Sequence, residues 1–496
     1  MIFFIVRRFL VAIPILLAAS VLMIFLVINS GDPLFDLQNS TNPDVDNLIA
    51  ARRRRLRLDD PAGERYWDWL TGLFSGDFGQ NREGQQVSTL LWQATQTTFR
   101  LVILATILAI VIGVVFGIIT AVRQYSIIDY SSTFAAFLFF SLPVFWVAVL
   151  LKEFGAIKYN DFLELPGFST SGSVVITLIV TALASGLVGG SGVRRLAAGA
   201  VGAIASIGVL VAMDSSDWLS NPGLSPLVIV QLSAGVAVGS AAAFAPLSNQ
   251  RVLASAFASA GIGLIGAWTF ESWLADPAWF QLFGLLAMSI LTGVVIGALI
   301  GGEIDRRYSM RAGAFATVGV GSVLLVDQFV SAWAPGRTIG TIGPQTPNLE
   351  GAFWERMVDY AGHQLLPSLA LALIGFATFM RFTRASMLDT LKSDYVRTAK
   401  AKGLPSTQVV LRHAFRTALI PVLTVVAISF ASIIEGAVIT ETVFGWKGMG
   451  QLFVEGLRNV DPYPVMGFVV VVAISTVLLN AIADILYAYV DPRIRR

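Results

Sequence analysis

The residues of this 496-residue chain best suited to chemistry are basic side chains gathered in one segment, 382–416. Its central stretch, YVRTAKAKGL at 395–404, spaces positive charges closely ahead of a glycine. No nucleophile–base pairing stands out there, so the chemistry on offer is electrostatic recognition of a partner. Two aspartates offset seven basic residues, which are Arg384, Lys392, Arg397, Lys400, Lys402, Arg412 and Arg416.

Patterns typical of catalytic and metal sites are missing from the sequence. The chain has no cysteine, which excludes thiolate metal sites and a cysteine nucleophile, and its two histidines, His363 and His413, lie far apart. No G-x-x-x-x-G-K-[ST] phosphate loop occurs, so this chain is not expected to hydrolyse ATP. We therefore predict no catalytic residue, no metal ligand and no cofactor held by this chain.

The basic segment carries signals for two short helices joined by a sharp bend. A run of helix formers follows Asp394, and Gly403 stands where a left-handed C-cap would end the helix. Pro405 suits the first turn of a second helix, with Ser406 or Thr407 as its cap. The alternative is a positively charged loop that only fixes membrane orientation. The predicted apolar side of the hairpin comprises Tyr395, Val396, Ala399 and Leu404, opposite a basic side.

The elements that position this segment are predicted to be membrane-spanning helices. Charged residues make up 13% of the chain, against about 25% in soluble domains, and the mean hydropathy is +0.73. The net charge of +2 gives no indication of a nucleic-acid surface. Residues 9–28 are long enough to cross a bilayer and follow Arg7 and Arg8, so we interpret them as an uncleaved first span; a cleaved signal peptide is the alternative.

Further apolar runs bring the predicted number of spans to about twelve. Each is close to the length that a bilayer core requires, and the backbone must satisfy its own hydrogen bonds there, so we predict helices. The predicted spans are 9–28, 99–121, 132–151, 172–190, 196–213, 225–245, 252–270, 280–300, 312–333, 363–380, 417–438 and 465–488.

The distribution of arginine predicts that both termini are cytoplasmic. Short loops on one side are basic, whereas 214–223 and 271–279 on the other side hold no Lys or Arg. The run RRRR at 52–55 falls in the long segment 31–98, where this rule weakens. The basic inner positions are Arg123, Arg194, Arg195, Arg251, Arg306, Arg307, Arg311, Arg493, Arg495 and Arg496.

Composition divides the predicted helices into a core and an inserted block. The helices between 172 and 333 are rich in Gly, Ala, Ser and Val, and small residues allow helices to approach closely in lipid. The fold class is therefore an all-α polytopic membrane protein, with a six-helix core and an inserted bundle of about six helices. The predicted domains are 1–30 (first helix), 31–98 (extracytoplasmic loop domain), 99–155 (core helices), 156–334 (inserted helices) and 335–496 (core helices with the coupling loop 382–416).

Several stretches resemble one family of transport proteins. DYVRTAKAKGL (394–404) and LRHAFRTALIP (411–421) are similar to the coupling segment of binding-protein-dependent ABC importer permeases, of the B-type in the dipeptide/oligopeptide/nickel branch. Arg397-Thr398-Ala399 replaces the wider superfamily's Glu-Ala-Ala but fits the peptide branch. Two features depart from the family: Lys447 stands where a proline is usual, and the block 156–333 has no counterpart in a six-helix member. The other similar stretches are RRFLVAIPILLAASVLMIFL (7–26), LTGLFSGDFGQN (70–81), SLPVFWVAVLL (141–151), EGAVITETVFGWKGMGQL (435–452) and DILYAYVDPRIR (484–495).

The resemblance implies a permease subunit that imports peptides or related small solutes and lies in the plasma (inner) membrane of a prokaryote. Its implied partners are a second homologous permease, two ABC ATPase subunits that bind ATP and Mg, an extracytoplasmic substrate-binding protein and the lipid bilayer. The residues implied for ATPase coupling are Asp394, Tyr395, Val396, Arg397, Ala399, Lys400, Lys402, Gly403 and Leu404. The candidates for the pathway or outer gate are Glu435, Glu441, Phe444 and Gly448.

Two other functions compete with an importer subunit. A self-contained secondary transporter would suit twelve helices, but it predicts sequence repeats and ionisable groups at the membrane midplane, and no repeat between the halves is visible. A membrane sensor or scaffold that kept the fold without transport is the third hypothesis. The sequence does not identify the solute, nor what the inserted helices do.

Overall fold

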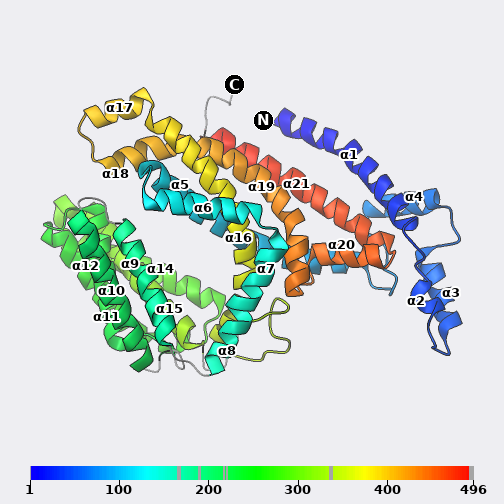
Figure 1. Ribbon diagram of the computed structural model, residues 1–496, viewed down its shortest axis with the longest axis horizontal. Helices are drawn as coiled ribbons and strands as arrows, with labels where there is room; N and C mark the ends of the chain where they lie inside the picture. Colours follow the sequence, from blue (N-terminus) through cyan, green and yellow to red (C-terminus); the bar gives the residue numbers. More distant parts are fainter. Residues whose placement is uncertain are drawn as a thin grey trace. The chain divides into compact units, whose positions relative to one another are not determined.

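The computed structural model describes residues 2–164, 169–187, 192–215, 218, 222–333 and 339–490. Within these residues all regular structure is helical, apart from one isolated bridge between Gln80 and Gln86, which confirms the predicted all-α fold. The helices, labelled in Figure 1, are α1 (Ile2–Ile28), α2 (Phe35–Gln38), α3 (Val45–Leu56), α4 (Ala62–Leu73), α5 (Val87–Val122), α6 (Ile127–Ser141), α7 (Val144–Lys152), the π-helix η1 (Glu153–Ile157), α8 (Lys158–Glu164), α9 (Thr170–Leu187), α10 (Gly192–Ser215), α11 (Pro226–Phe244), α12 (Gln250–Thr269), α13 (Glu271–Ala275), α14 (Trp279–Ile300), α15 (Gly302–Ser331), α16 (Phe353–Leu391), α17 (Asp394–Ala401), α18 (Ser406–Gln408), the π-helix η2 (Val409–Ala414), α19 (Phe415–Phe444), α20 (Met449–Arg458) and α21 (Pro462–Val490).

The helices are consistent with a multi-pass membrane protein. Among the described residues, seven helices are long and apolar enough to cross a bilayer, namely α5, α10, α11, α12, α14, α15 and α16. The pair α6–α7 adds an eighth if it counts as one broken span, and α1, α9 and α21 hold shorter apolar segments. The side chains in the middle of α19 lie outside the described set. The predicted total of twelve therefore stays a prediction.

The predicted span 132–151 is wrong as a single helix. It breaks between α6 and α7, and the chain direction changes there by 106°. Leu142 is extended, with φ −80° and ψ 131°, because the ring of Pro143 disfavours a helical residue before it. Pro143 then precedes the first turn of α7, where its missing N–H costs nothing.

The chain divides into two compact units. One contains residues 1–155, 341–344 and 364–496, so it holds the N-terminal helices, most of α16, and α17 to α21. The other contains residues 156–340 and 345–363, so it holds α8 to α15 and the first turns of α16. The basic segment and the proposed outer-gate residues all belong to the first unit.

In the first unit, α5 and α16 touch at two glycines spaced four apart. A Cβ added to Gly113 would lie 2.6 Å from Cβ of Phe379, and one added to Gly117 would lie 2.6 Å from Cβ of Thr383. The two helix backbones can approach this closely because glycine has no Cβ at these positions. Dispersion contacts fall off steeply with distance, and association in lipid depends on such contacts, so this crossing anchors α16 and the segment that follows it.

The second unit uses the same device between α14 and α15. A Cβ on Gly293 would lie 2.4 Å from the carbonyl oxygen of Gly313, and one on Gly297 would lie 2.3 Å from that of Ser309. Next to this crossing, alanines and valines of α11, α12 and α15 form a small buried cluster. The composition of this block, rich in small residues, thus corresponds to close backbone packing.

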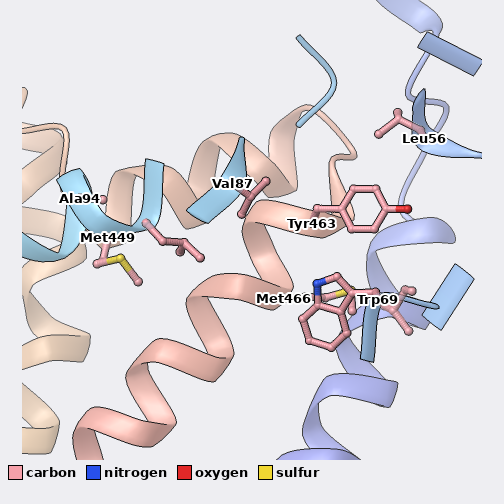
Figure 2. Packing of buried hydrophobic residues seen from close by; sticks show 9 residues of the cluster. Leu56, Trp69, Val87, Ala94, Met449, Tyr463 and Met466 are labelled. Carbon is pink, nitrogen blue, oxygen red and sulfur yellow. The ribbon is translucent and has the colours of Figure 1, made fainter. Parts of the chain in front are cut away.

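At one end of the first unit, α3 and α4 pack on the starts of α5, α20 and α21. Figure 2 shows the cluster, in which Trp69 of α4 and Tyr463 of α21 lie close to Leu56 of α3. Residues 66–73 form the C-terminal part of α4. Its Trp69 is buried, whereas Trp67 and the following Phe74 are exposed, at 62% and 91%.

Candidate functional site

The basic segment folds into a helix with a defined C-terminal cap. At the end of α17 the N–H of Leu404 donates to the carbonyl oxygen of Ala399 at 3.4 Å, and that of Gly403 donates to Lys400 at 3.0 Å. This pair of bonds is a Schellman motif, which requires a left-handed residue, and Gly403 has φ +73°. The predicted cap is confirmed, and it fixes the bend after α17, visible in Figure 1.

The apolar face of α17 packs on the first unit of its own chain. Val396 and Ala399 are buried with Met387 of α16 and Ala121 at the end of α5, and Leu404 packs against the same cluster half-buried. Tyr395 was predicted on this face, and that prediction is wrong, because its side chain is 45% exposed. Residues three apart share a helix face, and 396 and 399 are the pair that points inward.

The opposite face of the hairpin is exposed and basic. The side chains of Arg397, Lys400 and Lys402 are exposed, and Asp394 is exposed beside them. Asp394 approaches Arg397 at 3.9 Å, but an ion pair between exposed side chains contributes little. Tyr395 and this charged row therefore form the exposed surface of α17.

The second half of the hairpin differs from the prediction. Pro405 lies at the N-cap of the single turn α18, which continues through the π-helix η2 into α19. No side chain caps α18, so a capping role for Ser406 is wrong; the side chain of Thr407 lies outside the described set. Val409 and Ala414 of η2 instead join the buried cluster under α17, so packing holds this turn in place.

Of the seven Lys and Arg residues in segment 382–416, Arg384 is the one whose side chain is not exposed. Its guanidinium pairs with Asp129 of α6 at 2.8 Å, and the Asp129 side chain is 4% exposed. Asp129 also accepts the N–H of Tyr125 at 3.0 Å, while its own N–H donates to Ser126 Oγ at 3.2 Å. Asp129 was missed by the sequence reasoning, although Ser126 followed three residues later by an acid is the local signal of a capped helix start.

At the other end of α19, a fully buried carboxylate caps the next helix. Glu441 Oε2 accepts the N–H groups of Gly450 and Gln451, at 2.8 and 3.2 Å, which are free donors of the first turn of α20. Glu441 Oε1 accepts Thr98 Oγ1 at 2.5 Å, and that hydroxyl accepts the N–H of Met449 at 2.8 Å. Glu441 thus satisfies the start of α20 and ties it to α5.

The other proposed outer-gate residues surround this network. Gly448 is needed for space, because a Cβ there would lie 2.3 Å from the carboxyl carbon of Glu441. Phe444 is buried, and Lys152 Nζ lies 5.9 Å above its ring and donates to the carbonyl oxygen of Val443. Glu435 lies on α19, but its side chain is outside the described set.

A second buried carboxylate joins two distant loops. Asp461, 3% exposed, precedes α21, and its Oδ2 accepts the N–H of Arg82 at 2.6 Å. Burial raises the pKa of Asp461 to about 6, although the backbone N–H and the guanidinium of Arg82, with a weaker contribution from Arg52, favour the charged form. The sequence reasoning named Glu441 as an outer-gate candidate without its bond to Thr98, and it did not name Asp461, because these partners lie 343 and 379 positions away along the chain.

Two features of the first unit lie at opposite ends of α19. Among the described residues, no group of three or more His, Asp or Glu side chains is arranged to hold a metal ion. A stiff helix with a buried seat and an exposed basic face lies at one end of α19, and a network of buried hydrogen bonds lies at the other. Such a pairing suits the transmission of movement along a helix.

Comparisons with known proteins agree with this arrangement. Residues 317–496 match the family described as binding-protein-dependent transport system inner membrane component. Residues 1–88 match the N-terminal family of the same membrane components. Both matched regions include parts of the first unit, and the first contains α17 and Glu441.

Curated relatives are similar to part of the chain. The chain is 36% identical over 224 residues to the oligopeptide transport system permease protein OppB of Mycobacterium tuberculosis, covering 42% of this chain and 69% of that protein. It is 34% identical over 239 residues to the probable D,D-dipeptide transport system permease protein DdpB of Escherichia coli, covering 44% and 70%. It is 40% identical over 150 residues to the dipeptide transport system permease protein DppB of the same species, covering 30% and 44%.

Replacing Glu441 should loosen the start of α20. In Glu441→Ala the N–H groups of Gly450 and Gln451 and the hydroxyl of Thr98 lose a charged, buried acceptor. We expect a loss on the order of 3 kcal/mol of stability, read as a lower melting temperature in detergent. Glu441→Gln, which keeps one acceptor oxygen, should fall between Glu441→Ala and the unchanged protein.

The neighbouring Thr442→Ala serves as the matched control. Thr442 is exposed and bonds only to its own helix, so its loss should leave the melting temperature unchanged. Equal melting temperatures for Glu441→Ala and Thr442→Ala would reject the capping role.

The raised pKa of Asp461 predicts a fall in stability with rising pH. Because the folded chain holds this proton to about pH 6 and the unfolded chain releases it near pH 3.8, unfolding releases a proton between these values. The free energy of unfolding should therefore decrease by roughly 2–3 kcal/mol from pH 4 to pH 6. Thermal unfolding should show this slope reduced in Asp461→Asn, which keeps an acceptor for Arg82 but does not titrate; an identical slope in both proteins would contradict the assignment.

Proposed function

The chain belongs to the family of binding-protein-dependent transport inner-membrane components, and we propose that it is a permease subunit of an ATP-driven importer for di- or oligopeptides or related small solutes. The observation that carries this is the capped helix α17, seated on the permease by Val396 and Ala399 and exposing Tyr395 and a basic row. The names of the relatives support peptides as the solute class.

The structure of the hairpin supports a division of roles among the nine proposed coupling residues. Val396, Ala399 and Leu404 seat the helix on its own chain, and Gly403 fixes the bend. The exposed residues of the nine would then contact an ATPase subunit. These are Asp394, Tyr395, Arg397, Lys400 and Lys402.

The proposed complex supplies what this chain lacks. Two ATPase subunits bind ATP and Mg and dock against α17 and its counterpart, and a second homologous permease completes the pathway. An extracytoplasmic binding protein delivers the solute. The energy of ATP binding moves α17, and because Ser386 Oγ of α16 donates to the carbonyl oxygen of Ala418 in α19 at 2.9 Å, both helices follow that movement.

We further propose the plasma (inner) membrane as the location, with both termini cytoplasmic, and a core with an insertion as the domain plan. The arginine pattern supports the orientation. The proposed core is 1–155 with 335–496, and 156–334 forms the inserted bundle. The unmatched region between the two family matches, 89–316, contains most of that bundle.

Contact between α17 and an ATPase can be tested by cross-linking. The chain has no cysteine, so one introduced thiol is unique on it. In the assembled complex, Tyr395→Cys should cross-link to an ATPase subunit through a short bifunctional reagent. The control Val396→Cys, at a fully buried position, should not. An exposed but unreactive Tyr395→Cys in an active complex would contradict the proposal.

The bend at Gly403 should govern the efficiency of coupling. No atom lies within 4 Å of a Cβ placed there, so a side chain meets only backbone strain. Gly403→Val should cost about 1–2 kcal/mol in the bent state and lower the solute imported per ATP hydrolysed severalfold in proteoliposomes, with normal membrane insertion.

The matched control for this bend is Gly403→Asn. Asparagine adopts left-handed backbone far more readily than valine, so this variant should stay close to the unchanged protein. Full import by Gly403→Val would refute the role of the left-handed cap.

A further inference from the structure

A pocket of about 240 Å³ lies where α3, α4, the turn 77–80 and the start of α21 meet, all within the first unit. Neither the coupling hairpin nor the Glu441 network includes it. Its charged lining consists of three arginines and two aspartates, and its aromatic lining comes from Trp69 and Tyr463. Figure 2 shows both rings, with Tyr463 near Leu56 and Trp69 beside Met466.

Two buried donors that line this pocket have no acceptor among the described residues. Arg65 is 5% exposed and its Nε has no hydrogen-bond partner. Trp69 is 4% exposed and its Nε1, which can only donate, also has none. A buried donor without an acceptor is costly, and a buried cation more so, which makes both groups ready to bind an acceptor with negative charge.

Both carboxylates that line the pocket already have an ion-pair or hydrogen-bond partner other than Arg65. Asp68 pairs with Arg57, which also binds Asp60 at 2.6 Å. Asp77 is exposed and accepts the N–H of Gly79 at 2.8 Å. No carboxylate among the described residues lies within 4.0 Å of the Arg65 guanidinium, so its charge is left uncompensated.

Arg55 adds a second guanidinium without a carboxylate. Its Nη1 donates to the carbonyl oxygen of Arg82 at 2.9 Å, and no described acid pairs with it. The Tyr463 hydroxyl interacts with Arg65 and adds a further polar group. Two uncompensated guanidinium groups and an indole N–H around one pocket match the several acceptor oxygens of a phosphate.

The surroundings indicate the source of that phosphate. Tyr463 is the second residue of α21, whose apolar stretch runs from Pro462 to Leu478, so the pocket lies at the point where this helix enters the apolar phase. On the neighbouring α4, Trp67 and the following Phe74 are exposed aromatics of the kind enriched at membrane interfaces. Basic pockets at this depth suit lipid headgroups.

We propose that this pocket binds the phosphate group of a membrane phospholipid, with Arg65 and Trp69 as its principal donors and Arg55 as a supporting charge. The bound headgroup stabilises the packing of α3 and α4 on the start of α21. The site is separate from the proposed coupling surface, and the inference does not depend on the transport function.

The test is a titration of the full-length chain, in detergent, with phosphatidylglycerol, followed by native mass spectrometry. Arg65→Met removes the charge and should raise the dissociation constant about tenfold. Trp69→Phe keeps the ring and removes only the N–H, so it should raise the constant a few-fold. Arg53→Met is the matched control, since Arg53 lies on the same helix as Arg55, faces Asp59 and does not line the pocket.

Further arms distinguish the sources of the ligand. Diacylglycerol, which lacks phosphate, should not be retained, and excess inorganic phosphate should not displace the lipid completely. If the melting temperature shows that Arg65→Met does not fold, Arg65→Lys and Trp69→Phe are used instead. Arg65→Lys keeps the charge, so it should bind phosphatidylglycerol more tightly than Arg55→Met.

Three outcomes would overturn the proposal. One is unchanged lipid binding in both Arg65→Met and Trp69→Phe. Another is an equal loss in Arg53→Met, which would indicate diffuse attraction to the positive surface. The third is Arg65-dependent binding of inorganic phosphate, or of an acidic side chain on a partner protein detected by cross-linking, without retention of lipid.

Discussion

The ends of its helices place the strictest demand on this protein, because the first N–H and last C=O groups of a helix have no partner inside it. Where such an end is buried, another residue must supply that partner. Glu441 does so for α20, and the turn at Gly403 does so for α17. A few specific residues therefore fix the positions at which the chain turns, and the long helices run between these fixed points.

The same demand connects segments that are far apart in the sequence. Thr98 and Glu441 are 343 positions apart, and the backbone of Arg82 and Asp461 are 379 apart, yet each pair shares a short hydrogen bond. Buried bonds to a charged group are strong because no water competes for them. They make the end of the first unit that carries α20 a rigid frame, and the pocket around Arg65 lies in its periphery.

The hairpin formed by α17, α18 and η2 depends on an equally local division between buried and exposed faces. Helix α17 presents Val396 and Ala399 to its own chain and its charged row to the exterior, so force applied to the row reaches α16 and α19 through packed atoms. Arg384 extends this frame to α6 through Asp129. Close crossings at glycines, Gly117 in one unit and Gly297 in the other, let each unit pack tightly without a large buried side chain.

The sequence by itself determined what depends on neighbours along the chain: the helical fold from apolar runs of spanning length, the positions of most helices, and the cap at Gly403. It misplaced features that depend on which surfaces meet. Tyr395 is exposed, Ser406 caps nothing, and 132–151 is broken at Pro143. Only the tertiary structure decided the partners of Glu441, Asp129 and Asp461 and the donors gathered around Arg65, because a buried polar group is satisfied by whatever lies beside it in space, and composition and periodicity carry no record of that neighbour.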